Sequence, residues 1–286
     1  LRRAVERYNA GFNAWYDITD DVEAYLEVGF TKSTSPQIIA PSAAFGSAIN
    51  QVNCDNPVLS DEQRLLICGT ADIDGPYPRD LDGDGFAQAQ VRRRFVEGGG
   101  RTDDRTLTNF RVVGGFKGTL AEHWEWDIFG QYAETGLQRL QFNQVVQQPL
   151  ENTLDIVTDP STGEPACRVA VEGTDTDCVP FVRAFDLSLE YDPALQQYID
   201  TPTLTQGDTS QAIIGGTIQS DLGNYGVVSP FATDGISFLA GFEYRREELF
   251  TQADATAEQG LLVGSGGGLP PSDGATELQE VFFETS

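Results

Sequence analysis

Apolar and polar side chains alternate along residues 22–30 (VEAYLEVGF). Every second side chain from Val22 is apolar, and Glu23, Tyr25 and Glu27 lie between them. A period of two predicts a β-strand with one apolar and one polar face. The same period returns in six further segments, which are residues 3–16, 108–117, 124–132, 210–219, 235–250 and 278–283. The pattern therefore predicts an all-β chain of about seven strands.

The segments between these strands differ in length in a regular way. Residues 17–20 and 118–123 are short enough for hairpin turns, and residues 220–234 form a longer connection. Long loops are expected near residues 33–107, 135–207 and 251–277. Short turns at one end and long loops at the other are typical of a transmembrane β-barrel. A secreted β-sandwich is the alternative, but its strands recur about every 8–12 residues.

The chain is thus expected to be all-β, with antiparallel strands forming part of a large transmembrane β-barrel. Its polar faces carry Arg111, Lys117, Glu125 and Asp127, which are costly in a packed core and suit a water-filled interior. Aromatic residues near the strand ends fit the girdles at a membrane interface. These residues are Tyr8, Trp15, Tyr16, Trp124 and Trp126.

Two short helices are expected in the long loops. Ser60 can cap a helix over residues 61–67, with Gln63 completing a capping box. Asp192 can cap a second helix with Pro193 in its first position, and Pro202 lies beyond its end. The loop near residues 135–207 is strongly acidic, with 11 Asp and Glu against 3 Arg. The loops are therefore expected to be structured and exposed.

The composition excludes some classes of function. The net charge of -26 argues against binding to nucleic acid, whose phosphates need a basic surface. No apolar run reaches the roughly 18–20 residues of a membrane helix, which leaves a barrel possible. The chain contains no methionine and opens directly in a strand pattern. The simplest interpretation is an internal piece of a longer protein.

The four cysteines form two pairs that are close in sequence, Cys54 with Cys68 and Cys167 with Cys178. Four cysteines allow three pairings. The two local disulfides are favoured because each pair lies within one loop, and disulfides imply an exported protein. Four free thiols in a cytosolic chain are the alternative.

Residues 93–103 (RRFVEGGGRTD) resemble the barrel of bacterial TonB-dependent receptors, which are outer-membrane transporters. Supporting segments are residues 124–127 (WEWD), 159–163 (DPSTG), 178–180 (CVP) and 241–247 (GFEYRRE). The resemblance covers nearly all of residues 1–286. It is to the proteobacterial receptors with long extracellular loops.

The resemblance implies a barrel of about 22 strands, of which this chain is a part of the wall with three outer loops. It also implies a plug domain that this chain does not include. A TonB box in the N-terminal region, also missing here, would receive energy from TonB. The expected partners are outer-membrane lipid and lipopolysaccharide, the rest of the barrel, and a scarce nutrient that is imported. No covalent chemistry is implied, so we expect no enzyme.

Residues 80–85 (DLDGDG) match the first half of a calcium-binding loop. Asp80, Asp82 and Asp84 alternate before glycine, as hard oxygen ligands do around Ca²⁺. The twelfth position is Val91, where a bidentate Glu would be needed. Asp72 and Asp74 lie upstream and are other oxygen donors. The alternative is an acidic turn in solvent.

Four arginines cluster at the end of the first loop, and they are Arg92, Arg93, Arg94 and Arg101. They are candidates to contact an anionic ligand or a surface phosphate. The alternative is that they pair with Asp103, Asp104 and other acids of the loop.

Other chemistry finds less support. His123 is the single histidine, which disfavours a transition-metal site or a catalytic triad. Two carboxylate pairs on the polar faces, Glu125 with Asp127 and Glu23 with Glu27, suit the acid and base of a hydrolase, but side chains facing a wet barrel interior explain them without further assumptions. Besides transport, two functions remain open: a secreted or surface β-rich binding or structural protein, and an exported enzyme acting on glycosides. The substrate is not specified by the sequence.

Overall fold

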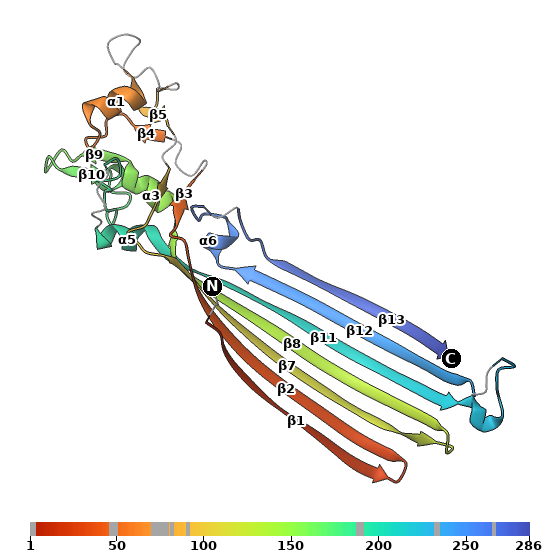
Figure 1. Cartoon of the computed structure of the whole chain (residues 1–286). Coiled ribbons are helices and arrows are strands. Elements are labelled where there is room, and N and C mark those ends of the chain that lie inside the picture. The colour runs from red at the N-terminus through yellow and green to blue at the C-terminus, as the bar shows by residue number, and fades with distance from the viewer. Residues whose placement is uncertain are drawn as a thin grey trace.

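The computed structural model describes residues 4–45, 51–69, 80, 83–89, 92–186, 192–231, 235–264 and 267–286. Seven long strands form one sheet in the order β1-β2-β7-β8-β11-β12-β13 (Figure 1). Every neighbouring pair is antiparallel. The strands are β1 Glu6–Thr19, β2 Val22–Ile39, β7 Arg101–Leu120, β8 Trp124–Val145, β11 Asp200–Asp221, β12 Ser237–Ala253 and β13 Ser272–Thr285.

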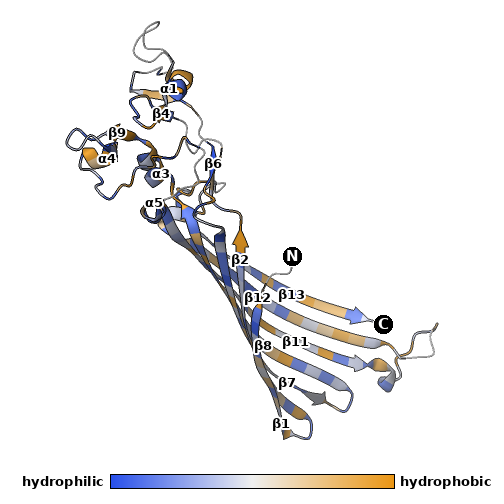
Figure 2. Cartoon of the chain, turned by 60° about the vertical axis from the view of Figure 1, so that its left-hand side comes forward, coloured by the Kyte–Doolittle hydropathy of each residue, from blue (hydrophilic) through white to orange (hydrophobic). Residues whose placement is uncertain are grey.

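The predicted all-β, antiparallel architecture is confirmed. The sheet is open: within the described residues, β1 and β13 are its two edges and do not pair with each other. Apolar and polar positions alternate along the strands (Figure 2). All residues of β1 and β13 are exposed, and among the described residues no second large sheet packs against this one.

The strands extend farther toward the loops than the alternation predicted. β7 begins at Arg101 rather than 108, and β8 ends at Val145 rather than near 132. The long loops therefore span residues 40–100, 146–199 and 254–271, shorter than the 33–107, 135–207 and 251–277 predicted. The added segments carry polar residues on both faces. For that reason, no apolar alternation marks those residues as strand.

The three long loops pack together at one end of the sheet, and we call this unit the loop body (Figure 1). It contains three small two-stranded sheets, β3-β6, β4-β5 and β9-β10. Its elements are β3 Ala43–Ala44, β4 Gln51–Asn53, α1 Asp61–Cys68, β5 Phe86–Gln88, β6 Arg93–Arg94, α3 Gln147–Leu154, β9 Ile156–Thr158, β10 Pro165–Cys167, α4 Arg168–Val171, α5 Pro193–Ile199 and α6 Ala255–Glu258.

The loop body has its own hydrophobic core. All three loops contribute to it, for example Phe95, Leu150 and Val263, each at most 2% exposed. Val145 at the end of β8 belongs to the same cluster, so the core continues onto the rim of the sheet. The loops are therefore a folded unit anchored to the strands that carry them.

Both predicted helices are present. Ser60 caps α1 and forms the capping box with Gln63, and Asp192 caps α5 with Pro193 in the first turn. Within the part of the chain that the structure describes, no helix is both long enough and apolar enough to cross a membrane.

At the opposite end of the sheet, the connections are tight. Three residues, 121–123, join β7 to β8, and two of them, Ala121 and Glu122, have φ values of 51° and 64°, in the left-handed region that tight hairpin connections use. A 3-10 helix, η1 Leu222–Tyr225, lies in the longer connection between β11 and β12.

Candidate functional site

The sheet has one apolar face that is largely exposed. On β1 this face shows Tyr8 at 60% and Tyr16 at 72% exposure, and on β13 it shows Val281 at 82% and Phe283 at 76%. Exposed apolar area of this extent marks a surface that contacts something other than water.

The apolar face ends toward the loop body at one polar residue on each strand. In sheet order these residues are Glu6, Lys32, Thr108, Glu134, Ser210, Arg246 and Gln279. They do not share one cross-strand row. A cross-strand row here is the line of residues paired from one strand to the next. Gln279 pairs with Tyr244, and the row that contains both reaches β1 at Ala14.

The boundary of the apolar face is therefore oblique. It moves by eight residues along the strands, from Glu6 to the row of Ala14, while crossing from β1 to β13. Eight residues of roughly 3.4 Å each, over six inter-strand steps of roughly 4.8 Å, place the boundary at about 40° to the cross-strand rows. If a flat plane followed this boundary, the strands would cross it at a tilt of about 40° from the normal of the plane.

The opposite face carries a chain of polar contacts across five strands. Arg111 on β7 lies 3.6 Å from Glu27 on β2 and donates to Gln131 on β8 at 2.9 Å. Gln131 donates to Gln211 on β11, which donates to Glu247 on β12, both at 2.7 Å. Each contact joins neighbouring strands, so on the polar face side chains link the strands across the sheet in addition to the backbone hydrogen bonds.

The predicted carboxylate pairs belong to this face. Asp127 accepts a hydrogen bond from the Tyr25 hydroxyl at 2.8 Å, and Lys117 lies 3.0 Å from Glu23. Glu125 accepts from Gln219 at 2.7 Å. These acids are engaged with side chains on adjacent strands, in an arrangement that ties strands together.

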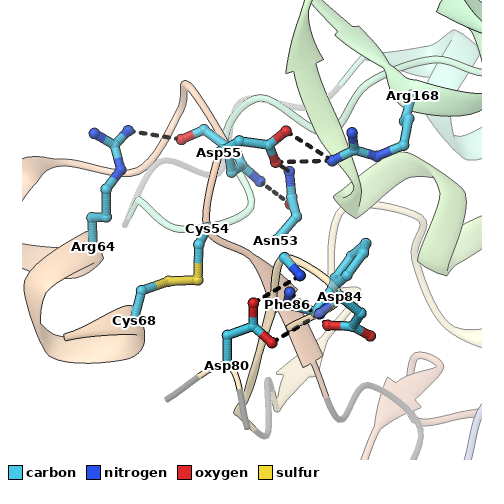
Figure 3. Close-up of a disulfide and its surroundings, with 11 residues drawn as sticks. Asn53, Cys54, Asp55, Arg64, Cys68, Asp80, Asp84, Phe86 and Arg168 are labelled. Carbon is cyan, nitrogen blue, oxygen red and sulfur yellow. Dashed lines mark hydrogen bonds and ion pairs between the residues drawn. A yellow bond between two sulfur atoms is a disulfide. The ribbon is translucent and has the colours of Figure 1, made fainter. Parts of the chain in front are cut away.

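Both predicted disulfides are confirmed. Cys54 is bonded to Cys68, and Cys167 is bonded to Cys178. The first bridge joins the segment after β4 to the end of α1 (Figure 3). Cys54, Cys68 and Ala87 form a small separate buried cluster, so this part of the first loop depends on its bridge for much of its core.

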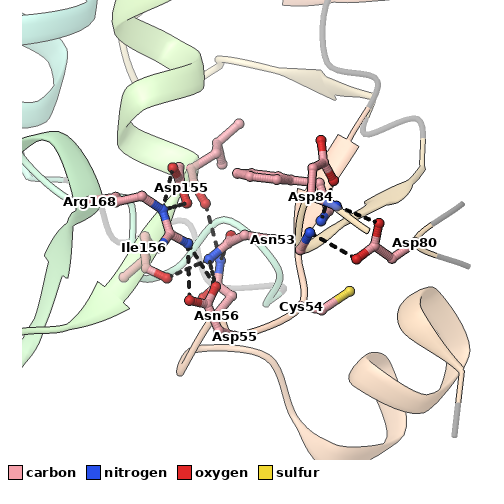
Figure 4. A network of polar contacts seen from close by, with 12 residues as sticks. Asn53, Cys54, Asp55, Asn56, Asp80, Asp84, Asp155, Ile156 and Arg168 are labelled. Carbon is pink, nitrogen blue, oxygen red and sulfur yellow. Dashed lines mark hydrogen bonds and ion pairs between the residues drawn. The ribbon is translucent and has the colours of Figure 1, made fainter. Parts of the chain in front are cut away.

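Two buried asparagines join the first loop to the second (Figure 4). Asn53 donates to the carbonyl of Ile156 at 2.7 Å, and Asn56 donates to the carbonyl of Leu154 at 3.1 Å. Asn56 also donates to Asn53 at 3.0 Å. A buried amide is stable only with its hydrogen bonds made, so these residues fix how the two loops meet.

Arg168 forms a second link between these loops. Its guanidinium donates to Asp55 of the first loop at 2.8 Å and to Asp155 of the second at 3.0 Å (Figure 4). Burial raises the pKa of Asp155 above its ordinary value, and the hydrogen bond from Arg168 partly offsets that effect. Sequence reasoning missed this cluster, because the residues are separated along the chain and no local pattern marks them.

The predicted calcium loop is only partly visible. Asp82, Asp72, Asp74 and Val91 lie outside the described residues. Asp80 accepts hydrogen bonds from the backbone amides of the turn after it, including Gly83 and Gly85, each at 2.8 Å (Figure 3). Asp84 likewise accepts from the amide of Phe86 at 2.9 Å.

These two carboxylates thus shape the turn itself. Among the residues that the structure describes, no group of three or more His, Cys, Asp and Glu side chains converges as metal ligands do. Calcium binding at Asp80, Asp82 and Asp84 stays a prediction.

The arginine cluster mainly holds the first loop in place. Arg93 forms an ion pair with Glu97, and its guanidinium lies 5.0 Å from the centre of the Phe181 ring. Arg94 and Arg101 donate to the backbone carbonyls of Pro41 and Ala40. Arg92 lies exposed before β6. Contact with an anionic ligand stays a prediction.

Asp103, the acid expected to pair with that cluster, has different partners. It is 2% exposed and accepts from Arg105 at 3.0 Å and from Arg139 at 2.7 Å. Arg139 comes from β8, opposite Arg105 in the sheet. The described contacts of Asp103 therefore stabilise the pairing of β7 and β8 rather than the first loop.

Comparison of the chain with protein-family models and with curated proteins gave no match.

Proposed function

We propose that this chain is part of the wall of an outer-membrane active transporter of the TonB-dependent receptor kind. Such a protein binds a scarce nutrient at the cell surface and passes it to the periplasm with energy supplied through TonB. The observation that carries the proposal is the oblique edge of the apolar face. Strands of membrane barrels are tilted by about 35–45°, and a boundary at about 40° is what a flat bilayer would impose on them.

The single layer of the sheet supports this proposal. A soluble sheet buries its apolar face against helices or a second sheet. Here the apolar face is left open over all seven strands, with no cover among the described residues. Lipid tails and lipopolysaccharide supply such a cover, and the rest of the barrel would pair with the free edges of β1 and β13.

The polar face suits the inside of that barrel. The chain from Glu27 through Arg111 to Glu247 is hydrogen-bonded yet partly exposed, as expected for a wall that faces water and a plug. The loop body would then stand outside the cell. Disulfide formation there agrees with an oxidising compartment.

Fractionation of the intact protein tests the proposal. We expect it in the outer membrane, with a gel mobility that changes when the sample is boiled, because a closed barrel resists detergent unfolding. Loss of ligand uptake on deletion of TonB would support the coupling. A freely soluble protein whose mobility is the same before and after boiling would contradict the proposal.

The second candidate is a secreted or surface β-rich binding protein without a transport role. The separate core of the loop body favours it, since this core does not require a membrane. It predicts a soluble protein in the same fractionation.

A further inference from the structure

A polar cavity lies in the loop body between the first and second loops. Its volume is about 370 Å³, within the roughly 300–1,000 Å³ of small-molecule sites. The strands β4 and β5 form one side, and α3 with the residue after it forms the other. The lining residues are Gln51, Asn53, Phe86, Gln148, Glu151, Asn152, Leu154 and Asp155.

The walls of this cavity are held in fixed positions. Asn53 is 1% exposed and bonds the carbonyl of Ile156 at 2.7 Å, which joins the two sides directly. Asp155 is bound by Arg168, which also reaches Asp55 on the first loop (Figure 4). The cavity is therefore built by the same contacts that join the loops, and it is a preformed site.

The chemistry of the lining selects the class of ligand. Four of the side chains are amides; Asn53 is already hydrogen-bonded within the loops, and Gln51, Gln148 and Asn152 present donors and acceptors. Among the described residues that line the cavity, Glu151 and Asp155 are acidic and none is basic. Arg168 pairs with both Asp155 and Asp55, so one cation faces three acids and the site stays net negative, which repels an anion. Hydroxyl groups, in contrast, can donate to carboxylates and accept from amides. Phe86 adds an aromatic surface for the C–H face of a ring.

We propose that this cavity binds a neutral, polyhydroxylated ligand, an oligosaccharide. The inference rests on the proposed transport function, for which it names the class of nutrient that the loop body captures. The cavity is thus expected to bind a neutral ligand, in contrast to the arginine cluster, for which an anion is expected.

Calorimetry on the intact protein in detergent tests the inference with defined probes. The neutral probes are maltohexaose, cellohexaose, xylohexaose and hexa-N-acetylchitohexaose, and hexagalacturonate is the anionic probe of equal length. At least one neutral hexasaccharide should bind more tightly than hexagalacturonate. Replacing both Gln51 and Gln148 by alanine should weaken that binding about tenfold, the effect of one or two lost hydrogen bonds.

Both glutamines are exposed, so the double variant should fold. Gln259→Ala, an exposed amide of the third loop, is the matched control and should bind like the unaltered protein. The inference is overturned if no neutral probe binds, if hexagalacturonate binds best, or if the double variant binds as tightly as the unaltered protein.

Failure of this inference is distinguishable from failure of the proposed function. A protein that resides in the outer membrane and changes mobility on boiling, yet binds no neutral probe, overturns the ligand class alone. A freely soluble protein overturns the transport function.

Discussion

Arg168 and Asp55 lie 113 residues apart in the sequence, and their side chains meet at 2.8 Å. The same guanidinium binds Asp155, so one cation holds acidic groups from two loops together. In a chain with a net charge of -26, removing this cation leaves two carboxylates close to each other without their partner.

Arg168→Ala should therefore loosen the contact between the first and second loops. We expect the loop body to lose about 1–3 kcal/mol of stability. The loss should be smaller than for a fully buried ion pair, because Arg168 and its two partners are partly exposed. Limited proteolysis would show faster cleavage in both loops. The matched control is Arg183→Ala, whose pair with Asp186 at 3.7 Å is half-exposed; equal cleavage of the two variants would contradict the prediction.

Ile214→Arg tests what covers the apolar face. Ile214 lies near the middle of the apolar stretch of β11 and is 56% exposed in the open sheet. If lipid covers it, arginine should cost about 2–4 kcal/mol, measured as a lower urea midpoint in detergent or lipid. Thr217→Arg, on the polar face of the same strand, should change stability little. A similar stability for both variants would indicate that water covers both faces.

Removal of the first disulfide should affect the loop and spare the sheet. Cys54→Ser with Cys68→Ser opens a loop with a sequence separation of 14, for which chain entropy predicts a loss of about 3 kcal/mol. Proteolysis should then cut within residues 51–69. The change of gel mobility on boiling should persist, and its loss would contradict the separation of loop body and sheet.

The pKa values of Asp155 and Asp159 should be shifted in opposite directions from the ordinary value of an aspartate. Burial raises the pKa of Asp155, so its contribution to stability is present below pH 3.8 and is lost as the pH rises through the folded value. Hydrogen bonds from Ser161 lower the pKa of Asp159, so its contribution is present above pH 3.8 and is lost as the pH falls through the folded value.

Carbon-13 NMR of labelled aspartate carboxyl groups would measure both values, with Asp155→Asn and Asp159→Asn to assign the signals. The higher pKa should belong to Asp155. The reverse order, or two equal values, would contradict the arrangement of the second loop.

The sequence predicted much of the sheet because its signal is local. Alternation around Val22 and Trp124 placed the strands and their faces, and the caps at Ser60 and Asp192 placed two helices. The alternation did not predict residues 101–107 as strand. Thr102 and Asp103 interrupt the apolar period there, although their backbone still pairs with β8.

The loop contacts were beyond such reasoning. Nothing near Asn53 indicates that its amide meets the carbonyl of Ile156, since that contact depends on how two loops pack in space. The local disulfides were predictable because each bridge closes within one loop.

The two ends of the sheet also suggest how such a protein can diversify. Backbone hydrogen bonds hold the seven strands in register, while the loop body relies on its own core and bridges. Substitutions that reshape the cavity near Gln148 therefore leave the strand ladder unchanged. If the chain is part of a transporter wall, as proposed, selection can change the ligand preference of the loop body at small cost to assembly of the strands, so related chains should differ most in the loops and least along the strands.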